Sequence, residues 1–353
     1  MGVWKGIIKA LAILIAVIVA VALLGVGYLS LTEYRPEAVA PLAAPQGGAN
    51  SPKVGEAFTI LSLNTGYAGL DASADFFMDG GRSVQPETRQ QVETNLQSLA
   101  RLLQQHPADA YFLQEVDRNS KRSFGMDQAA FYEQALGLEG VFAYNYHCKF
   151  VPFPWPPIGR VESGLLTLTS APCAQASRIQ LPNPFSWPVR LANLKRCLLV
   201  TRIPVAHSSR ELVLINLHLE AYDDGEGKLL QTQMLCELLE QEYAAGNYVI
   251  AGGDFNQTFP GSLERYPILN QAHWVPGALS QADLPAGFSF GVDHSAPTCR
   301  LLNAPYDPAA SQVYVIDGYI LSPNLRLEQV TTIETGFAHS DHQPILLQAT
   351  LLP

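Results

Sequence analysis

Several short apolar runs in this sequence end in side chains that bear carboxylates, carboxamides or imidazoles. These residues are Asn64, Gln114, Glu115, Asn216, His218, Asp254, Asn256, Asp317, Asp341 and His342. Taken singly, each has a structural explanation, since Asn64 fits a turn, Asp254 a cap and His218 the core. Because the strands of packed sheets converge at one edge, however, the recurrence of these residues predicts that they meet in a single polar site.

The chemistry of such a site follows from its carboxylates. Three or more acids that meet without basic partners repel one another unless a cation or protons neutralise them. Oxygen ligands of this kind favour Mg²⁺, with Mn²⁺ as the alternative, over zinc. No Cys-x-x-Cys pair is present, so a cysteine zinc site is disfavoured. The five cysteines are either buried free thiols or include one disulfide; they are Cys148, Cys173, Cys197, Cys236 and Cys299.

The elements that position these residues alternate between strands and helices. Apolar runs predict strands at 58–63, 110–113, 141–146, 164–169, 197–203, 212–219, 247–252, 313–320 and 344–350. Apolar residues at three- and four-residue spacing predict helices over 86–106 and 228–243. Segments 148–162 and 259–310, rich in Pro, Gly and Asn, are expected to be loops over the site or its rim. This pattern predicts packed sheets flanked by helices in one domain.

Six of these segments resemble, in order, motifs of the endonuclease/exonuclease/phosphatase family. They are Leu61-Ser-Leu-Asn64, Phe112-Leu-Gln-Glu115, Ile215-Asn-Leu-His-Leu219, Gly253-Asp-Phe-Asn256, Ile316-Asp-Gly-Tyr319 and Ser340-Asp-His-Gln-Pro344. The family includes deoxyribonucleases, abasic-site endonucleases, neutral sphingomyelinases and inositol polyphosphate 5-phosphatases. The resemblance, which covers about residues 56–351, implies an α/β fold, specifically a four-layer α/β/β/α sandwich with the site at one end of the central sheets.

The resemblance also implies metal and phosphate ligands. Glu115 resembles the principal Mg²⁺ ligand, and Asn64 beside it resembles a residue that helps to hold metal or phosphate. Asp341 corresponds to a supporting residue and is a further candidate metal ligand, while Asn216 supports the site. Asn256 resembles a residue that binds a phosphate oxygen. The expected cofactor is therefore Mg²⁺ or Mn²⁺.

Acid–base roles follow in the same way. His342 resembles the histidine that works at the scissile phosphate, oriented by Asp317, and Asp254 resembles the residue that positions or deprotonates the attacking water. His218 matches a second histidine of the deoxyribonuclease, sphingomyelinase and 5-phosphatase branches. Hydrolysis of a phosphoester needs an aligned water, stabilised charge on phosphoryl oxygens and help for the leaving alkoxide, which these groups would supply.

Two family features have weaker counterparts. The mid-domain Gly-x-Ala/Gly-Ile/Leu-x-Ser segment of many members is matched only loosely, by residues 163–170. The active-site tyrosine of some members has Tyr144 and Tyr146 as candidates.

The N-terminal part of the chain predicts a membrane anchor. Ala10–Thr32 is a run of 23 uncharged residues, and about 20 helical residues cross a bilayer core. Lys5 and Lys9 precede it, so the positive-inside tendency directs the rest of the chain out of the cytoplasm. A cleaved signal peptide, with Ala-Val-Ala at 38–40 as its site, is the alternative. We divide the chain into an anchor (1–32), a proline- and glycine-rich linker (33–56) and a catalytic domain (57–353).

Charge and location narrow the substrate. Residues 32–353 contain 20 Lys and Arg against 32 Asp and Glu, a formal net charge of −12, and no basic run. Such a surface does not gather polyanions over long distances, so nucleic acid is disfavoured as a partner. We expect a small or lipid-linked phosphoester, with an extracellular endonuclease as the leading alternative. A binding module without activity is the third reading, disfavoured because every principal site position is filled.

Overall fold

Two β-sheets form the centre of the molecule. The computed structural model describes residues 2–45, 48–223 and 225–353. The first sheet has the order β1 (Val39–Leu42), β6 (Gln175–Gln180), β7 (Cys197–Pro204), β8 (Glu211–His218), β9 (Tyr248–Asp254), β15 (Asp317–Leu321) and β12 (Ser289–Gly291). The second has the order β16 (Leu325–Thr332), β17 (Ile345–Leu351), β2 (Ala57–Asn64), β3 (Ala110–Asp117), β5 (Gly159–Thr169) and β4 (Gly140–Val151).

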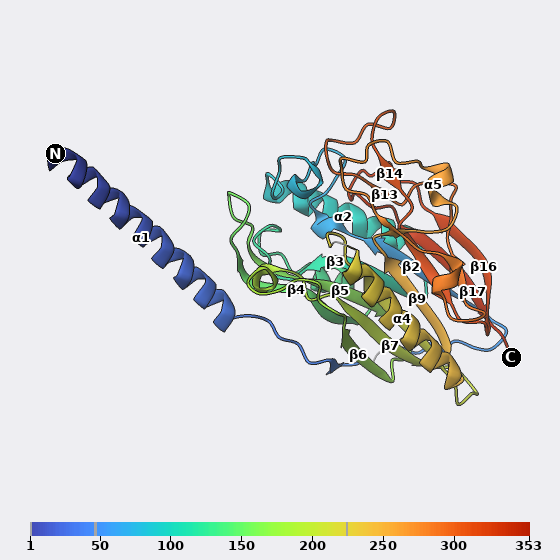
Figure 1. Ribbon diagram of the computed structural model, residues 1–353. Coiled ribbons are helices and arrows are strands. Elements are labelled where there is room, and N and C mark those ends of the chain that lie inside the picture. The colour runs from blue at the N-terminus through green and yellow to red at the C-terminus, as the bar shows by residue number, and fades with distance from the viewer. Residues whose placement is uncertain (1, 46–47, 224) are drawn as a thin grey trace.

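The longest helices of the domain cover the outer faces of the sheets. Figure 1 shows α2 (Arg89–Gln105) and α4 (Glu226–Ala244) on opposite sides of the strands. Thr88 caps α2 by accepting a hydrogen bond from the Gln91 N–H. A shorter helix, α3 (Gln128–Leu136), packs beside α2, and the single-turn α5 (Ser262–Arg265) lies in a connection. The remaining strands are the two-residue pieces β10 (Gln257–Thr258), β11 (Gly277–Ala278), β13 (Cys299–Arg300) and β14 (Val313–Tyr314).

The core explains the layers, because alternate residues of each strand enter different apolar clusters. In β2, Phe58 and Ile60 face the other sheet, whereas Leu61 and Leu63 pack against α2. The same alternation in β8 divides its residues between the inter-sheet layer and the layer under α4. The Tyr319 hydroxyl links the two sheets, because it lies within hydrogen-bond distance of the Ile60 and Ile345 carbonyl oxygens, at 2.9 and 3.0 Å. The predicted four-layer α/β/β/α sandwich is thus confirmed.

Several predicted boundaries differ from the structure. The run 313–320 is two strands, β14 and β15, because the Thr298 hydroxyl accepts the Ile316 and Asp317 N–H groups between them. The loop predicted at 148–162 is shorter, since β4 extends to Val151 and β5 begins at Gly159. Within the segment 33–56, β1 pairs with β6. All five cysteines are free, so none forms the disulfide left open above.

The N-terminal helix α1 (Gly2–Leu31) extends away from the domain (Figure 1). Residues 3–31 include an 18-residue window with a mean hydropathy of 3.1 and are long enough to cross a membrane. The helix is therefore a candidate membrane span by length and composition.

Candidate active site

Three neighbouring strands bring three predicted site residues into one row. In the parallel pair β8 and β9, His218 lies opposite Asp254, and in the antiparallel pair β9 and β15, Asp254 lies opposite Asp317. Gly253 permits the close approach, because a Cβ at this position would lie 2.1 Å from the Leu217 carbonyl oxygen. All three polar side chains are buried. The row is thus a direct result of strand register.

The second sheet supplies the facing residues. Asn64 ends β2, and Glu115 lies in β3 where the register with β5 shifts between Leu113 and Val116. Glu115 has a φ of 54°, a left-handed conformation that is costly for a residue with a side chain and that occurs most often at functional sites. His342 comes from the segment before β17 and forms an isolated bridge with Cys299. Asn64 Nδ2 lies 3.2 Å from Glu115 Oε1 and 3.0 Å from Asp254 Oδ2.

His342 and Asp317 form the pair that the resemblance implied. His342 Nδ1 is 2.8 Å from Asp317 Oδ2, which leaves Nε2 directed toward Asp254 Oδ2 at 3.6 Å and Asn64 Nδ2 at 3.4 Å. Burial lowers the pKa of His342, but the carboxylates of Asp317 and Asp254 outweigh it and raise this pKa well above its usual value. The two carboxylates therefore favour the imidazolium form of His342.

His218 is in the opposite state. Burial lowers its pKa well below the usual value, and the charges of Arg196 and His342 lower it further. Its Nε2 lies 3.3 Å from Asp254 Oδ2. Burial raises the pKa of Asp254 to about 6, with Asp317 adding to the rise and His342 opposing it. Two histidines whose pKa values are shifted in opposite directions lie beside one carboxylate, an arrangement suited to acid–base chemistry.

Glu115 and Asp341 form no such close ion pair. In the part of the chain that the structure describes, no lysine or arginine nitrogen lies within 4.0 Å of either carboxylate. Burial raises the pKa of Asp341 to about 7; the charge of His342 opposes this rise, the charge of Glu115 adds to it, and that of Arg300 opposes it. A bound cation would remove this penalty, and the donors are hard oxygens of the type that Mg²⁺ and Mn²⁺ prefer. These two carboxylates therefore fit the expected metal ion.

A second group could be considered for a metal by spacing alone. Ligand atoms of Asp254, Asp317 and His342 lie within 4.8 Å of one another. Asp317, however, already contacts Nδ1 of the His342 ring, so only Nε2 of that ring remains for another ligand. Glu115 and Asp341 therefore remain the candidate metal ligands.

The three asparagines differ in what they offer. Asn64 Oδ1 accepts the Gly66 N–H, so its amide nitrogen faces Glu115 and Asp254 in this arrangement. Asn256 donates one N–H to the Leu219 carbonyl, and its other N–H remains for a ligand. Asn216 lies between the sheets, where it accepts from Gln114 Nε2 at 2.8 Å. Its position is structural.

A cavity of about 280 Å³ opens above this cluster. Glu115, His218, Asp254, Asn256, Asp341 and His342 all line it. Of the two candidate tyrosines, Tyr146 lines the cavity, whereas Tyr144 stacks on His147. The segments that form its walls include part of the predicted loop 259–310, which contributes Trp274 and Arg300.

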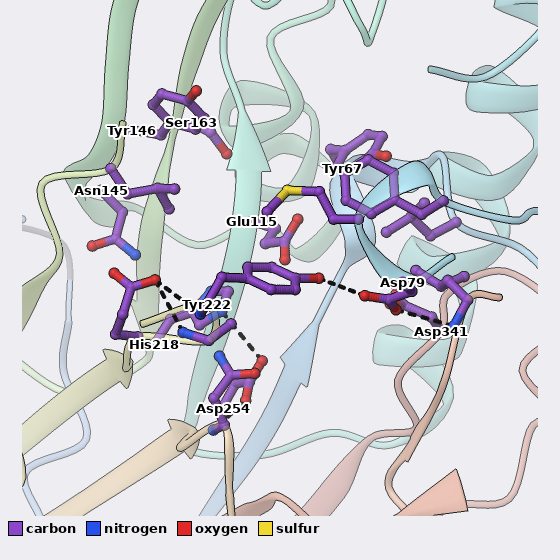
Figure 2. A pocket seen from close by; sticks show the side chains of 18 of the residues that line it. Tyr67, Asp79, Glu115, Asn145, Tyr146, Ser163, His218, Tyr222, Asp254 and Asp341 are labelled. Atoms are coloured by element: carbon purple, nitrogen blue, oxygen red, sulfur yellow. Dashed lines mark hydrogen bonds and ion pairs between the residues drawn. The ribbon is translucent and has the colours of Figure 1, made fainter. Parts of the chain in front are cut away.

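Sequence reasoning missed the residues of the cavity walls. Figure 2 shows Tyr222 extending across the pocket, with its hydroxyl 2.7 Å from Asp79 Oδ1. Arg122 lies over the Tyr67 ring at 3.8 Å and pairs with Asp117. Tyr222 follows His218 by four residues, but no motif marked it, because its position depends on a contact with a distant segment. The polar floor is thus predictable from strand ends, whereas the walls are not.

The family is shown by its sequence profile, which matches residues 71–342 under the description Endonuclease/Exonuclease/phosphatase family. The chain belongs to this family. No curated protein matches the sequence.

Solved structures of the family share the fold at low identity. The chain is similar to an endonuclease/exonuclease/phosphatase from Beutenbergia cavernae DSM 12333, with 16% identity, a TM-score of 0.58, and 84% of this chain and 72% of that chain covered. ANGEL2, a 2′,3′-cyclic phosphatase solved with adenosine-2′,3′-vanadate, gives 16% identity, a TM-score of 0.55, and coverage of 84% and 96%. D. rerio TDP2 complexed with a single-strand DNA product gives 15% identity and a TM-score of 0.51, with 84% of this chain and 99% of that chain covered.

Proposed function

We propose that this protein is a Mg²⁺-dependent phosphoesterase that hydrolyses a small or lipid-linked phosphoester at a membrane-tethered site outside the cytoplasm. The observation that carries the proposal is the pairing of two environments in one cavity. Asp254 and the His342–Asp317 pair provide acid–base groups, while Glu115 and Asp341 provide carboxylates without an ion pair for a cation. A metal bound there would supply charge stabilisation for the phosphoryl oxygens.

The side chains have complementary roles. Asp254 remains mostly ionised at neutral pH and accepts a proton from the attacking water or holds that water in line. The His342 imidazolium, fixed by Asp317, donates through Nε2 to a phosphoryl oxygen or the departing oxygen. Asn64 and Asn256 offer N–H groups that contact phosphate oxygens, and neutral His218 orients Asp254 from its other side.

The tether is the helix α1. Its apolar length supports a span, and Lys5 and Lys9 before it support an orientation with the N-terminus in the cytoplasm. Protease added outside intact cells is then expected to remove the catalytic domain. A domain that is digested only after lysis would show that it is cytoplasmic, and release of the domain in soluble form would favour the cleaved signal peptide.

Substrate choice rests on charge and location. The net charge of −12 over residues 32–353 and the membrane tether favour a small or lipid-linked phosphoester over DNA. An extracellular endonuclease is the alternative. The structural similarity to TDP2, which was solved with a single-strand DNA product, is the reason to test DNA as a substrate.

A substrate panel tests the proposal. Full-length protein with Mg²⁺ is assayed on sphingomyelin, phosphoinositides, nucleotides and DNA, with His342→Ala protein as the matched control for contaminating activity. We expect hydrolysis of a lipid or small ester above that control. Preferential cleavage of DNA would favour the endonuclease, and no turnover of any phosphoester would leave a binding module.

A further inference from the structure

Two connections in the domain carry large apolar side chains in solvent. The connection between β4 and β5 exposes Phe153 and Trp155, whose exposed fractions are 71% and 88%, and that between β6 and β7 exposes Trp187 and Val189 at 57% and 59%. We call these four residues the apolar rim. Scattered exposed apolar residues are ordinary, but a group that includes two indoles and a phenyl ring marks a surface with a partner.

The end of α1 is docked beside this rim. Trp187 Nε1 donates to Ser30 Oγ at 3.3 Å, and Leu29 is buried in a cluster with Val151 and Leu191. Figure 1 shows the β4–β5 connection on the side of the domain from which α1 extends. The rim and the C-terminal end of α1 therefore form one continuous surface.

Ion pairs fix this arrangement just beyond the helix. The Glu33 carboxylate lies 3.3 Å from Lys195 Nζ and 3.2 Å from Arg190 Nε. Arg190 belongs to the same connection as Trp187 and Val189. The contacts on both sides of the helix end restrict how the domain tilts relative to α1.

Helix length then places the rim at a membrane boundary. At about 1.5 Å per residue, the uncharged run Ala10–Thr32 is about as long as a bilayer hydrocarbon core with a few ångströms to spare. Ser30 near its end lies at the outer edge of the hydrocarbon, and Trp187 bonded to it lies at the same depth. Indole rings prefer this interface, because one edge is polar and the rest is apolar.

The same two connections form part of the mouth of the catalytic cavity. Ile158 follows Trp155 by three residues, Phe185 precedes Trp187 by two, and both line the cavity. An apolar path thus leads from the rim to the cavity that contains the carboxylates. Four prolines at 152, 154, 156 and 157 stiffen the first connection, so little chain entropy is lost when it binds.

We propose that the apolar rim inserts into the surface of the bilayer that α1 spans, so that the cavity receives the phosphoester head group of a lipid in that membrane. The proposal rests on the proposed function in that α1 is the anchor. Its occupant is the lipid surface rather than a second copy of the chain, since the rim lies where the helix already fixes the membrane.

Quenching of tryptophan fluorescence tests the insertion without any need for activity. Full-length protein with Trp4→Phe is placed, one chain per disc, in phosphatidylcholine nanodiscs whose acyl chains do or do not carry bromine. Bromine is expected to quench Trp155 and Trp187, and the quenched component is expected to shrink in Trp155→Phe and Trp187→Phe proteins. Trp274, which lines the cavity, is the internal control, and Trp274→Phe is expected to leave the quenched component unchanged.

The outcomes separate the two proposals. Unquenched Trp155 in protein that has entered the discs overturns the insertion while leaving the anchor and the active site intact. A dimer in detergent that Trp155→Ser dissociates would mean that a second chain covers the rim, and this result also overturns the proposal. Protein that fails to enter discs overturns the anchor and the insertion together.

Turnover tests the lipid route. In discs of phosphatidylcholine, phosphatidylglycerol and phosphatidylinositol, Phe153→Ser/Trp155→Ser is expected to release lipid head groups about tenfold more slowly or worse. Hydrolysis of soluble bis(4-nitrophenyl) phosphate is expected to stay unchanged. Leu269→Ser, at an exposed leucine (64%) outside the cavity and the rim, is the matched control. Equal losses on both substrates, or no loss on lipid, would overturn the proposal.

Discussion

The two halves of the catalytic cavity differ in how their carboxylates are neutralised. In the acid–base half, formed by Asp254, Asp317 and His342, the imidazolium lies 2.8 Å from one carboxylate and 3.6 Å from the other. In the carboxylate half, formed by Glu115 and Asp341, no basic side chain of the described residues forms an ion pair. Both halves are built from the same residue type at the ends of strands, so only the neighbouring groups distinguish them.

Because of this difference, we expect the two halves to differ in their need for a bound cation. In the acid–base half, one imidazole ring faces both carboxylates, so their charge is partly offset by a residue of the chain itself. In the carboxylate half, the pKa of Asp341 is raised to about 7, so the ionised form of this residue destabilises the folded state. Carboxylates kept in such a position are typical of cation sites. The predictions below run from the largest expected effect to the smallest.

Removal of the cation is expected to have the largest effect. Treatment with EDTA should reduce phosphoester hydrolysis to the level of a reaction without enzyme, and excess Mg²⁺ or Mn²⁺ should restore it, because Glu115 and Asp341 form no ion pair with a basic side chain of the described residues. Glu115→Gln should not be restored by the same metal concentration. Full turnover by metal-free protein in chelator would remove the metal from the account.

Mutation of the acid–base half comes next. His342→Ala should lower kcat by about 10²–10⁴-fold, the usual contribution of a positioned acid–base group. Asp317→Asn should cost nearly as much, and the double variant little more than the worse single variant, since the two residues act as one unit. Turnover of the three variants is compared after circular dichroism shows that each is folded. Losses that simply multiply would mean that the residues act independently.

The affinity for metal should depend on pH through Asp341. Its raised pKa of about 7 means that a proton competes with the cation below that pH, so affinity rises as pH increases toward 7 and then levels off. The expected slope is about tenfold per pH unit for one released proton. Isothermal titration of Mn²⁺ from pH 5.5 to 8.5 measures it. Asp341→Asn should bind more weakly but with a flatter profile, and an equally steep profile in that variant would assign the proton elsewhere.

A smaller effect concerns the stability of the metal-free protein. The folded state keeps the Asp341 proton at pH values where the unfolded chain, with an ordinary value of 3.8, has lost it. The free energy of unfolding therefore falls as pH rises from about 4 to about 7. Asp341→Asn should gain stability on the order of a few kcal/mol at pH 8 in EDTA. Calorimetric Tm values provide the measurement, and a variant that melts below the wild type would contradict it.

The comparison also shows which parts of the molecule the sequence predicts. The buried strands β2, β3, β8 and β9 were found because their apolar runs end in polar residues, and α2 because Val92, Leu96, Leu99 and Leu103 recur at helical spacing. The edge strand β16 was missed, because half of its residues are exposed and most are polar, so they give no apolar run. The helix α3 escaped prediction as well, since it is only nine residues long.

The cavity walls were missed for a different reason. Three wall residues lie in connections between strands: Tyr222, Arg122 and Trp274. Their positions depend on irregular turns or on contacts with other segments. The Tyr222 hydroxyl, for example, donates to Asp79. Local sequence does not encode such contacts. The orientation of Asn64 could not be predicted either, because it depends on the hydrogen bond that the Gly66 N–H donates to Asn64 Oδ1. The ends of the strands predict which residues meet in the site, and tertiary contacts determine how their side chains are oriented.

The central claim is that the cation binds in the carboxylate half and not in the acid–base half, and the position of a bound Mn²⁺ tests it most directly. Crystals of the protein soaked in Mn²⁺ at pH 8 and measured at the manganese absorption edge would reveal the ion by its anomalous signal. The account predicts one peak within coordination distance of Glu115 and Asp341, while the contact between His342 and Asp317 stays in place. A peak among Asp254, Asp317 and His342, with that contact broken, would contradict it.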